Sequence, residues 1–400
     1  MPARIYITGS GVVSAIGLGK EATLAALRSD ASGVAPLQFL QTSDRSFLAG
    51  EVKMTDAGMK ALLGMDSGFA VSRTSLMGIL ALREALREAG LGTESLRTLP
   101  LISGTTVGGM DCTERYYRDY LAEGNAHGEY IALHDCGAST EAIADWFGGF
   151  AWATTLSTAC SSAANAVILG ANLIKAGLAS IVAVGGSESL SDYHLNGFNS
   201  LMIVDREPCR PFDRTRAGLN LGEGAAFLIL ESGESVRRRG VKPLAEVSGY
   251  GNACDAFHQT ASSENGEGPF LAMGQALRMA GLRPADIDYI NAHGTGTPNN
   301  DASESAAIRR IFGEACPPVS STKPFTGHTT SASGSIEAVF CLLAMRHGFI
   351  PANLNWHEAD GDCLVPVSRM REGVVLRHVL CNAFGFGGND SSLLLSRIDY

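Results

Sequence analysis

The chain has 400 residues, of which 45% are hydrophobic and only 18% are charged, with a formal net charge of −10. Charged residues make up about 25% of an average domain, so this composition favours a large buried core and excludes a disordered chain. The negative charge argues against nucleic acid or an anionic membrane surface as a partner, and no apolar run reaches the ~18 residues of a spanning helix.

Nine scattered cysteines without a C-x-x-C pair indicate neither a disulfide framework nor a zinc site. The first residues lack the pattern of a signal peptide, so a cytoplasmic protein is expected.

Short β-branched runs alternate with longer Ala- and Leu-rich segments, which is typical of an α/β fold. The first half is predicted to contain strands over residues 4–8, 99–103, 154–157, 181–184 and 225–230, and helices over 21–28, 73–89, 140–146 and 162–176. The second half is predicted to contain strands over 245–250, 289–292, 379–382 and 392–396, and helices over 270–280, 301–311 and 335–347. No Pro- or Ser-rich linker divides the chain, so two tightly fused halves, residues 1–244 and 245–400, are expected.

Two segments, one in each half, share the same order of residue types. Each begins with Ser-Thr, at Ser157 and at Ser321, passes through small polar residues and enters a helix that is apolar nearly all round. A helix that is apolar on every side is a buried helix. The likeness predicts a duplicated fold whose core helices face each other, with a chance similarity of Ala-rich segments as the alternative.

Cys160 follows a predicted strand and opens the first of these buried helices. At such a corner, unpaired backbone N–H groups and the helix dipole favour a thiolate, so a lowered thiol pKa is expected. The neighbouring small residues leave room for a substrate. Most cysteines are inert buried side chains, as Cys341 inside an apolar helix is expected to be. The position of Cys160 favours a nucleophile instead.

Two histidines also lie where apolar runs give way to loops of small residues. His293 ends a predicted strand in NAHGTGTP, and His328 precedes a buried helix in STKPFTGH, five residues after Lys323. A histidine at the end of a buried strand is placed for catalysis in many α/β folds. A satisfied core side chain is the alternative for each histidine taken singly.

The glycine-rich turn FGFGG at residues 384–388 follows another predicted strand. Exposed backbone N–H groups in such a turn suit an anion or a polarised carbonyl oxygen. The turn lacks the spacing and the lysine of a P-loop, so N–H groups facing a substrate carbonyl are the preferred interpretation. Neither a nucleotide site nor a metal site is predicted.

These motifs occur in the order STACSSA, NAHGTGTP, STKPFTGH and FGFGG, and together they resemble those of the β-ketoacyl-acyl-carrier-protein synthases. These are the elongating condensing enzymes (ketoacyl synthase I/II type) of fatty acid and type II polyketide synthesis. The resemblance extends over essentially the whole chain. It implies a thiolase-like duplicated fold with five α-β-α-β-α layers and an acyltransferase that needs no cofactor, since its substrates are carried on the phosphopantetheine of acyl carrier protein.

The resemblance also implies a role for each motif. Cys160 takes the acyl chain as a thioester, while His293 and His328 bind the malonyl carbonyl and stabilise the enolate formed as carbon dioxide leaves. Attack on acyl-Cys160 gives a 3-oxoacyl chain two carbons longer. Lys323 supports the histidines and pairs with Glu337. The backbone N–H groups of Cys160 and Phe386 form the oxyanion hole, and the Phe386 ring gates the acyl pocket. The further positions that match substrate-binding residues are Thr295, Thr297, His258, Thr260, Val107 and Phe384.

The sequence departs from the common elongating enzymes at some positions. Asn389 and Asp390 follow GFGG where those enzymes have Thr-Asn, and only Lys60 remains of a basic cluster often used to dock the carrier. These departures fit an aryl polyene or dialkylresorcinol pathway as well as housekeeping elongation. Acyl carrier protein is the expected partner and a homodimer the expected assembly, with a heterodimer with a paralogue as the alternative.

Three other functions would each require residues different from those found here. A non-catalytic partner of the chain-length-factor kind lacks the nucleophilic cysteine, which is present here at position 160. A thiolase needs a second catalytic cysteine, for which Cys381 within a strand is the sole candidate. An initiating synthase has asparagine where His328 stands. The two-histidine pattern favours the decarboxylating enzyme.

Overall fold

The computed structural model describes residues 4–42 and 44–398. The strands of the first half are β1 (Ile5–Ser14), β2 (Gly17–Leu18), β3 (Ala35–Pro36), β4 (Leu48–Ala49), β5 (Leu101–Gly104), β6 (Ala153–Leu156), β7 (Ile181–Glu188) and β8 (Gly224–Ser232). Its helices are α1 (Lys20–Arg28), α2 (Asp56–Leu63), α3 (Arg73–Ala89), α4 (Thr93–Leu96), α5 (Met110–Ala122), α6 (Gly128–Ile131), α7 (Cys136–Trp146), α8 (Ser162–Lys175), α9 (Asp192–Ser200) and α10 (Gly233–Arg239).

The second half repeats this alternation. Its strands are β9 (Ala245–Cys254), β10 (Tyr289–Asn291), β11 (Val319–Ser320), β12 (Phe349–Ile350), β13 (Arg371–Glu372), β14 (His378–Gly385) and β15 (Asn389–Ser396). Its helices are α11 (Glu267–Ala280), α12 (Pro298–Phe312), α13 (Lys323–Thr326) and α14 (Ser333–His347), with short 3-10 turns at Pro284–Asp286, Thr330–Ala332 and Phe386–Gly388.

Every strand and helix predicted from the sequence is present, with ends that differ by a few residues. Among the helices that the pattern did not predict, α5 contributes little to the core. In α5 only Cys112 is buried, and its other faces carry charged and tyrosine side chains. A segment with so few buried apolar side chains gives little sign of a core helix.

The main sheet shows the predicted duplication. Its strands follow the order β11-β10-β14-β15-β9-β1-β8-β7-β5-β6. From β1 outward, the pairings with β8, β7, β5 and β6 are antiparallel, antiparallel, parallel and parallel. From β9 outward, the pairings with β15, β14, β10 and β11 repeat the same series. A short antiparallel pairing of β1 with β9 joins the two series.

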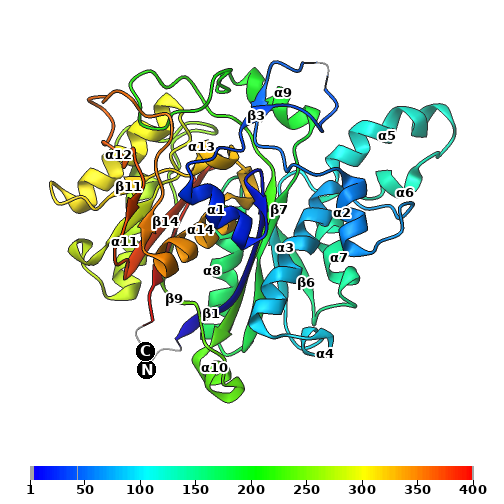
Figure 1. Cartoon of the computed structure of the whole chain (residues 1–400), viewed down its shortest axis with the longest axis horizontal. Helices are drawn as coiled ribbons and strands as arrows, with labels where there is room; N and C mark the ends of the chain where they lie inside the picture. The colour runs from blue at the N-terminus through cyan, green and yellow to red at the C-terminus, as the bar shows by residue number, and fades with distance from the viewer. Residues whose placement is uncertain (1–3, 43, 399–400) are drawn as a thin grey trace.

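The two buried helices α8 and α14 lie between the two series of strands, as Figure 1 shows near the centre of the molecule. They approach so closely that a Cβ atom on Gly334 would lie 2.8 Å from the backbone nitrogen of Ala164. Every residue of α14 from Ser333 to Met345 is buried. The prediction of two core helices facing each other is therefore confirmed.

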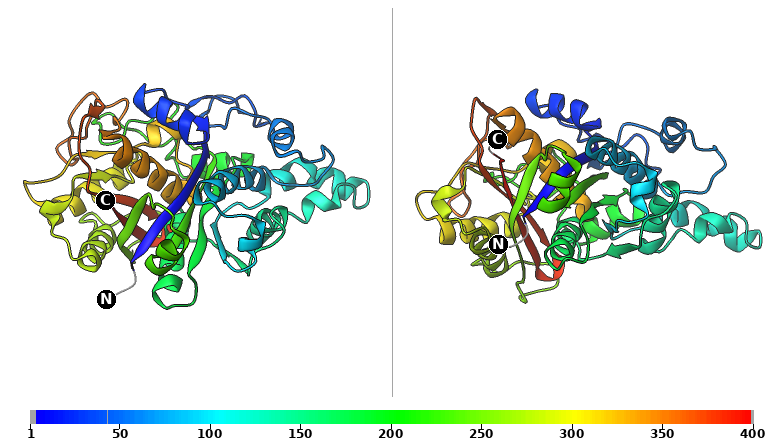
Figure 2. Two further views of the ribbon diagram at one scale, coloured as in Figure 1. Left: turned by 60° about the horizontal axis from the view of Figure 1, so that its bottom comes forward. Right: turned by 90° about the horizontal axis from the view of Figure 1, so that it is seen from below.

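Helices α3 and α11 cover the outer faces of the two series of strands (Figures 1 and 2). A Cβ atom on Gly11 of β1 would collide with the carbonyl oxygen of Ala81 in α3, and one on Gly251 of β9 would collide with that of Ala272 in α11. Equivalent glycines thus allow equivalent close packing in both halves. Within the described residues, the result is the five-layered α-β-α-β-α arrangement expected from the resemblance.

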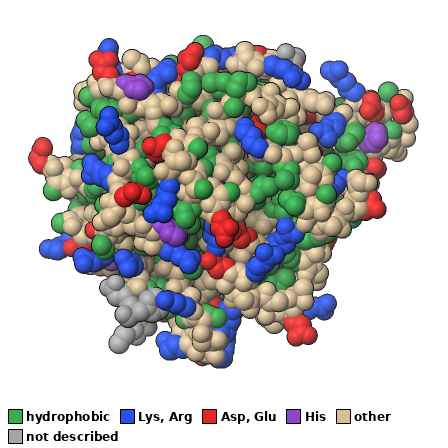
Figure 3. Space-filling view, viewed as in Figure 1, with side chains coloured by type: hydrophobic (Ala, Val, Ile, Leu, Met, Phe, Trp, Pro, Cys, Tyr) green, Lys and Arg blue, Asp and Glu red, His purple; other side chains and the backbone are tan. Residues whose placement is uncertain are grey.

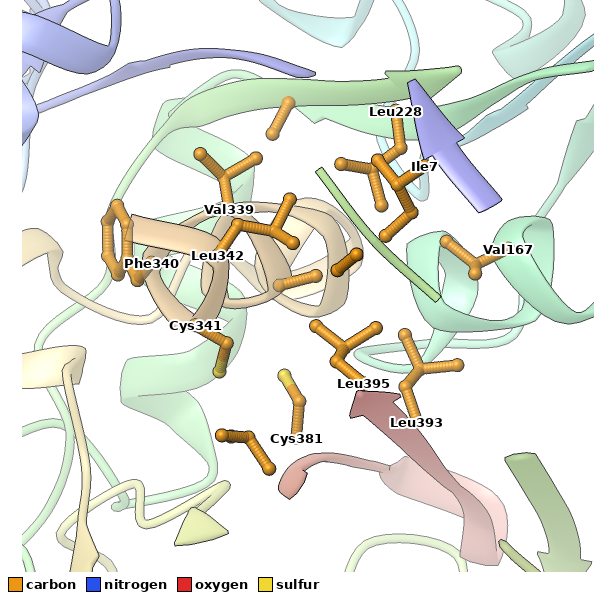
Figure 4. Close-up of a cluster of buried hydrophobic side chains, with 14 of the residues drawn as sticks. Ile7, Val167, Leu228, Val339, Phe340, Cys341, Leu342, Cys381, Leu393 and Leu395 are labelled. Atoms are coloured by element: carbon orange, nitrogen blue, oxygen red, sulfur yellow. The ribbon is translucent and has the colours of Figure 1, made fainter. Parts of the chain in front are cut away.

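Side chains of α14 join the two halves into one core. In Figure 4, Val339 and Leu342 of α14 lie among Ile7 and Leu228 of the first half and Leu395 of the second. Burial of apolar side chains is worth about 25 cal/mol per Å². A shared core of this kind makes independent unfolding of either half costly. Among the described residues, no helix has the length and apolar sequence needed to cross a bilayer.

Candidate active site

Cys160 lies on a tight corner between β6 and the N-terminus of α8. Ala159 adopts a left-handed φ of 51°, a region that costs a non-glycine residue about 1–2 kcal/mol. The Ser162 hydroxyl accepts the backbone N–H of Thr158 at 2.9 Å and donates to the carbonyl oxygen of Ala159 at 2.6 Å. The small polar residues around Cys160 therefore hold the strained corner that presents the sulfur to a pocket.

This pocket has a volume of about 330 Å³. One wall is apolar and comes from α9 and the loop after it, and the other walls come from loops that begin at the ends of strands. The lining residues are Cys160, Phe198, Leu201, Ile203, Leu219, Thr260, Ala261, Ser262, His293, Thr295, Thr297, Pro298, Asn299, Asn300, His328 and residues 384–388. The pocket thus joins an apolar surface to the cluster of nucleophile and imidazoles.

His293 enters the pocket just beyond the end of β10. The carboxylate of Glu304 in α12 accepts the backbone N–H groups of His293 at 2.9 Å and Gly294 at 2.8 Å. Asn382 of β14 donates its side-chain N–H to the same carboxylate at 3.0 Å. The buried Glu304 side chain therefore hydrogen-bonds the backbone of the loop that carries His293, and this fixes the position of the imidazole.

His328 lies between α13 and α14 and contacts the nucleophile directly. Its Nε2 atom is 3.1 Å from Sγ of Cys160, and its Nδ1 atom is 3.1 Å from the hydroxyl of Ser333. Its backbone N–H donates to the carbonyl oxygen of Asn220 at 2.7 Å. Because a hydroxyl can donate or accept, Ser333 is compatible with either tautomer of His328.

The two imidazoles lie edge to face, with ring centroids 5.1 Å apart and an interplanar angle of 83°. The ring of Phe384 lies 5.8 Å from that of His293. This arrangement leaves both histidines facing the space beside Cys160. Two N–H donors in this position can hold one developing oxyanion.

Lys323 and Glu337 form a buried ion pair behind the histidines. The Nζ and Oε1 atoms are 2.7 Å apart, and the two side chains are only 1% and 4% exposed. Burial raises the pKa of Glu337, and the Lys323 cation opposes that shift. A buried charge of this kind is tolerated because it has a partner.

Burial governs the protonation states of the site. Desolvation, reinforced by the Lys323 cation, holds the pKa of His293 and of His328 well below the usual range, so both imidazoles are neutral at pH 7. Burial also raises the pKa of Cys160 to about 12, although the Lys323 charge opposes this. The expected lowering of the thiol pKa is therefore wrong, because desolvation of the thiolate outweighs the effect of the helix terminus and the cation.

Phe386 contributes both its backbone and its ring. Its backbone N–H, with that of Cys160, hydrogen-bonds the thiolate form of Cys160 and favours it. Its ring stacks on Phe198 of α9, with centroids 5.7 Å apart and an interplanar angle of 18°. Two backbone N–H groups beside the sulfur have the placement of an oxyanion hole.

Most of the residues singled out in the sequence meet in this pocket, namely Cys160, His293, His328, Thr260, Thr295, Thr297, Phe384 and Phe386. Lys323 and Glu337 lie behind it. His258 is exposed, and its Nδ1 atom accepts the N–H of Thr260 at 3.2 Å. Val107 is buried beside the Glu188 carboxylate, so neither His258 nor Val107 lines the pocket.

Sequence reasoning missed several residues of the site, among them Phe198, Glu304 and Ser333. No local sequence pattern marks these residues, because each one acts through a contact with a residue more than four positions away along the chain. Cys381, the second cysteine that a thiolase would require, points from β14 into the core toward Cys341 (Figure 4) and does not line the pocket.

The duplicated sheet, the paired central helices and the pocket that holds a cysteine with two histidines define a ketosynthase of the thiolase-like fold. The N-terminal domain of the β-ketoacyl synthases matches residues 3–235, and their C-terminal domain matches residues 244–357. The chain belongs to the β-ketoacyl synthase family. It is a condensing acyltransferase of the 3-oxoacyl-[acyl-carrier-protein] synthase type, in fatty acid or polyketide biosynthesis.

Full-length relatives support this assignment. The chain is 34% identical to nodulation protein E of Rhizobium meliloti, and the alignment covers 100% of both chains. It is 32% identical to 3-oxoacyl-[acyl-carrier-protein] synthase 2 of Vibrio cholerae serotype O1 over 99% of both chains.

Solved structures agree over the same length. The ishigamide ketosynthase/chain length factor superposes with a TM-score of 0.93 at 33% identity, covering 100% of both chains. A ketosynthase in complex with its chain length factor from Xenorhabdus doucetiae gives a TM-score of 0.83 at 32% identity, covering 99% of this chain and 98% of that one.

Proposed function

We propose that Cys160 carries the acyl chain and that His293 and His328 drive decarboxylative condensation with a malonyl thioester. The observation that supports this most is the 3.1 Å contact between Sγ of Cys160 and Nε2 of His328, with a second neutral imidazole beside it. A thiolate is both a good nucleophile and a good leaving group for acyl transfer. Neutral imidazoles can donate hydrogen bonds to an enolate without protonating its carbon.

In the first half-reaction, Sγ of Cys160 attacks the carbonyl carbon of the incoming acyl thioester. The raised thiol pKa requires a base at the moment of attack, and Nε2 of His328 is within reach of the proton. The backbone N–H groups of Cys160 and Phe386 hold the tetrahedral oxyanion. The bond to the pantetheine sulfur then breaks, and the proton passes from His328 to the leaving thiolate.

In the second half-reaction, the carbonyl oxygen of the malonyl thioester accepts hydrogen bonds from ring N–H groups of His293 and His328. His328 has by then changed tautomer, so that Nε2 carries the proton and Nδ1 accepts the Ser333 hydroxyl. The bond to the malonyl carboxylate breaks, carbon dioxide leaves, and the electron pair forms an enolate. Its carbon attacks the acyl carbonyl, the carbon–sulfur bond to Cys160 breaks, and the thiolate takes up one proton from water. The Lys323 cation favours the negative charge on both thiolate and enolate, while Glu337 keeps Lys323 in place.

The mouth of the pocket fits a pantetheine arm. The Thr295 and Thr297 hydroxyls lie 2.9 Å apart, and Thr260 and Ser262 line the same pocket. We assign Thr260, Thr295 and Thr297 to this arm. His258 is assigned to the malonyl side, where its Nδ1 atom accepts the N–H of Thr260. Val107 is assigned to the acyl side on the resemblance alone, since it does not line this pocket.

The arm is delivered by an acyl carrier protein. Figure 3 shows basic and acidic side chains mixed over the face it displays, without one continuous basic region. With a net charge of −10, the chain does not attract an acidic carrier through its overall field. Docking therefore depends on local contacts around the mouth of the pocket.

A second ketosynthase-type chain completes the assembly, and a homodimer is the form we propose. Strand β6 ends the sheet, so one of its edges pairs with no other strand in the described residues. Exposed edges of this kind invite pairing with another chain. Because β6 leads into Cys160, such pairing places the partner near the site. Light scattering is expected to give twice the mass of one chain, whereas a monomer, or folding only with a different paralogue, would contradict the homodimer.

The intact mass of the protein tests the proposed reaction. Incubation with acyl-carrier protein is expected to add one acyl group per chain, and malonyl-carrier protein is expected to discharge it as a 3-oxoacyl product. His293→Asn is expected to retain acylation but to slow the malonyl-dependent discharge by roughly 10²–10³-fold, because one enolate donor is lost. His378→Asn, distant from the pocket on β14, serves as the control. No adduct with any acyl length offered would overturn the proposal.

A further inference from the structure

Asp390 is a buried acid directly behind the turn that carries Phe386. It is the second residue of β15 and is only 2% exposed. Its Oδ2 atom is buried without a hydrogen-bond partner among the described residues. A buried, unpaired carboxylate is costly, so this side chain needs a proton or a partner.

A second acid, Asp255, lies against the first. A Cβ atom on Gly268 would collide with Oδ2 of Asp390 and lie 2.8 Å from Cβ of Asp255, so both side chains flank the same point. The Asp255 carboxylate accepts the N–H and the hydroxyl of Ser263, each at 2.7 Å, and the N–H of Gly268 at 3.0 Å. Three donors therefore satisfy the Asp255 side chain near the N-terminus of α11, whereas Oδ2 of Asp390 has none among the described residues.

The charged groups that act on Asp390 are both acidic. They are Asp255 in the loop after β9 and Glu304 in α12, and no cation opposes them among the described residues. Burial, reinforced by these two carboxylates, raises the pKa of Asp390 to about 8. A proton on Asp390 removes the repulsion that two adjacent carboxylates would exert on each other.

The two acids lie where two loops of the active site meet. The backbone N–H of Asp255 donates to the carbonyl oxygen of Gly388 at 3.0 Å, and that of Gly387 donates to the carbonyl oxygen of Gln259 at 2.8 Å. The loop of residues 255–260 is therefore tied to the turn that presents Phe386. Repulsion between Asp255 and Asp390 would act directly on this connection.

We propose that Asp390 is a positioning residue that stays protonated beside Asp255 and thereby holds the Phe386 turn against the 255–260 loop. The inference rests on the proposed role of the Phe386 N–H in the oxyanion hole. Loss of the proton leaves two adjacent carboxylates, which push the two loops apart. The Phe386 N–H then moves away from Sγ of Cys160, and acyl transfer slows.

The test compares Asp390→Asn with the wild type in single-turnover acylation of Cys160 between pH 6.5 and 9. The variant keeps the shape of the side chain but cannot ionise, so the two proteins are expected to react at similar rates at pH 6.5. At pH 9 the variant is expected to be about tenfold faster, because a group that titrates near 8 is then only about one-tenth protonated. Taking the ratio of the two rates removes the common effect of pH on the Cys160 thiol.

Stability gives an independent readout. The pKa of Asp390 in the folded protein lies above its unfolded value, so the folded state binds an extra proton between about pH 4 and pH 8. The wild type is therefore expected to lose Tm relative to Asp390→Asn as the pH rises through this window. Asp362→Asn, at an exposed turn, is the matched control and is expected to show neither effect.

Parallel pH profiles for wild type and Asp390→Asn would overturn the inference, as would an Asn variant that is already impaired at pH 6.5. If that variant fails to fold, Asp255→Asn removes the same pair of carboxylates and is expected to abolish the alkaline loss of acylation. A wild type that forms no acyl adduct at any pH contradicts the proposed function instead. The two failures are thus distinguishable.

Discussion

Cys160→Ala is expected to abolish acyl transfer, with a loss of roughly 10⁴-fold or more in condensation. Cys160 supplies the one thiol that lines the pocket within the described residues, so no neighbour can replace it. Intact mass after incubation with acyl-carrier protein measures the first half-reaction, and release of carbon dioxide from malonyl-carrier protein measures the second. The alanine variant is expected to show no acyl adduct.

Cys316→Ala provides the matched control. Cys316 is half-buried in the loop between α12 and β11 and does not line the pocket, and its sulfur contacts the carbonyl oxygen of the adjacent Pro317. This variant is expected to acylate normally. An acyl adduct on the Cys160→Ala protein at the wild-type rate would show that the nucleophile lies elsewhere.

Lys323→Met is expected to lower both activity and stability. The substitution leaves Glu337 buried without its cation, and breaking a buried pair in this way costs about 3–5 kcal/mol of unfolding free energy. The raised pKa of the unpaired Glu337 means that this loss is largest above its folded pKa and fades as the pH falls toward the usual range of a glutamate. Denaturant unfolding at several pH values measures the effect.

The double variant Lys323→Met/Glu337→Gln separates the two roles of the ion pair. With both charges removed, most of the stability is expected to return, because no unpaired charge remains buried. Condensation is expected to stay low, because the cation no longer favours the thiolate and the enolate. Recovery of activity together with stability would mean that Lys323 is only a structural partner of Glu337.

Local patterns predicted much of this fold. The long helices α3 and α14 were visible because one follows a helical apolar period and the other is apolar nearly all round. The strand ends that carry Cys160 and His293 were visible because apolar runs stop there at small and glycine-rich residues. Helix α5 was not visible because it buries almost nothing.

The protonation states of the buried side chains could not be predicted from local sequence patterns. The sequence placed Cys160 at a helix terminus, which favours a thiolate, but the surrounding layers desolvate the sulfur and raise its pKa to about 12. Likewise, nothing near Asp390 in the sequence reveals that Asp255 lies against it, because β15 and the loop after β9 are 135 positions apart yet adjacent in the sheet. Desolvation and through-space charge depend on which segments pack together.

The sequence by itself determined the class of protein, its duplicated α/β architecture and the cysteine, histidine and lysine residues on which the proposed chemistry depends. The architecture and the candidate residues follow from periodicity and from residue types at strand ends, and the class follows from the resemblance of the ordered motifs to those of a known family. Only the tertiary structure decided which nitrogen faces the sulfur, which acid holds each loop and which groups are charged. Such properties arise when buried segments distant in the chain come within a few ångströms of one another and exclude water.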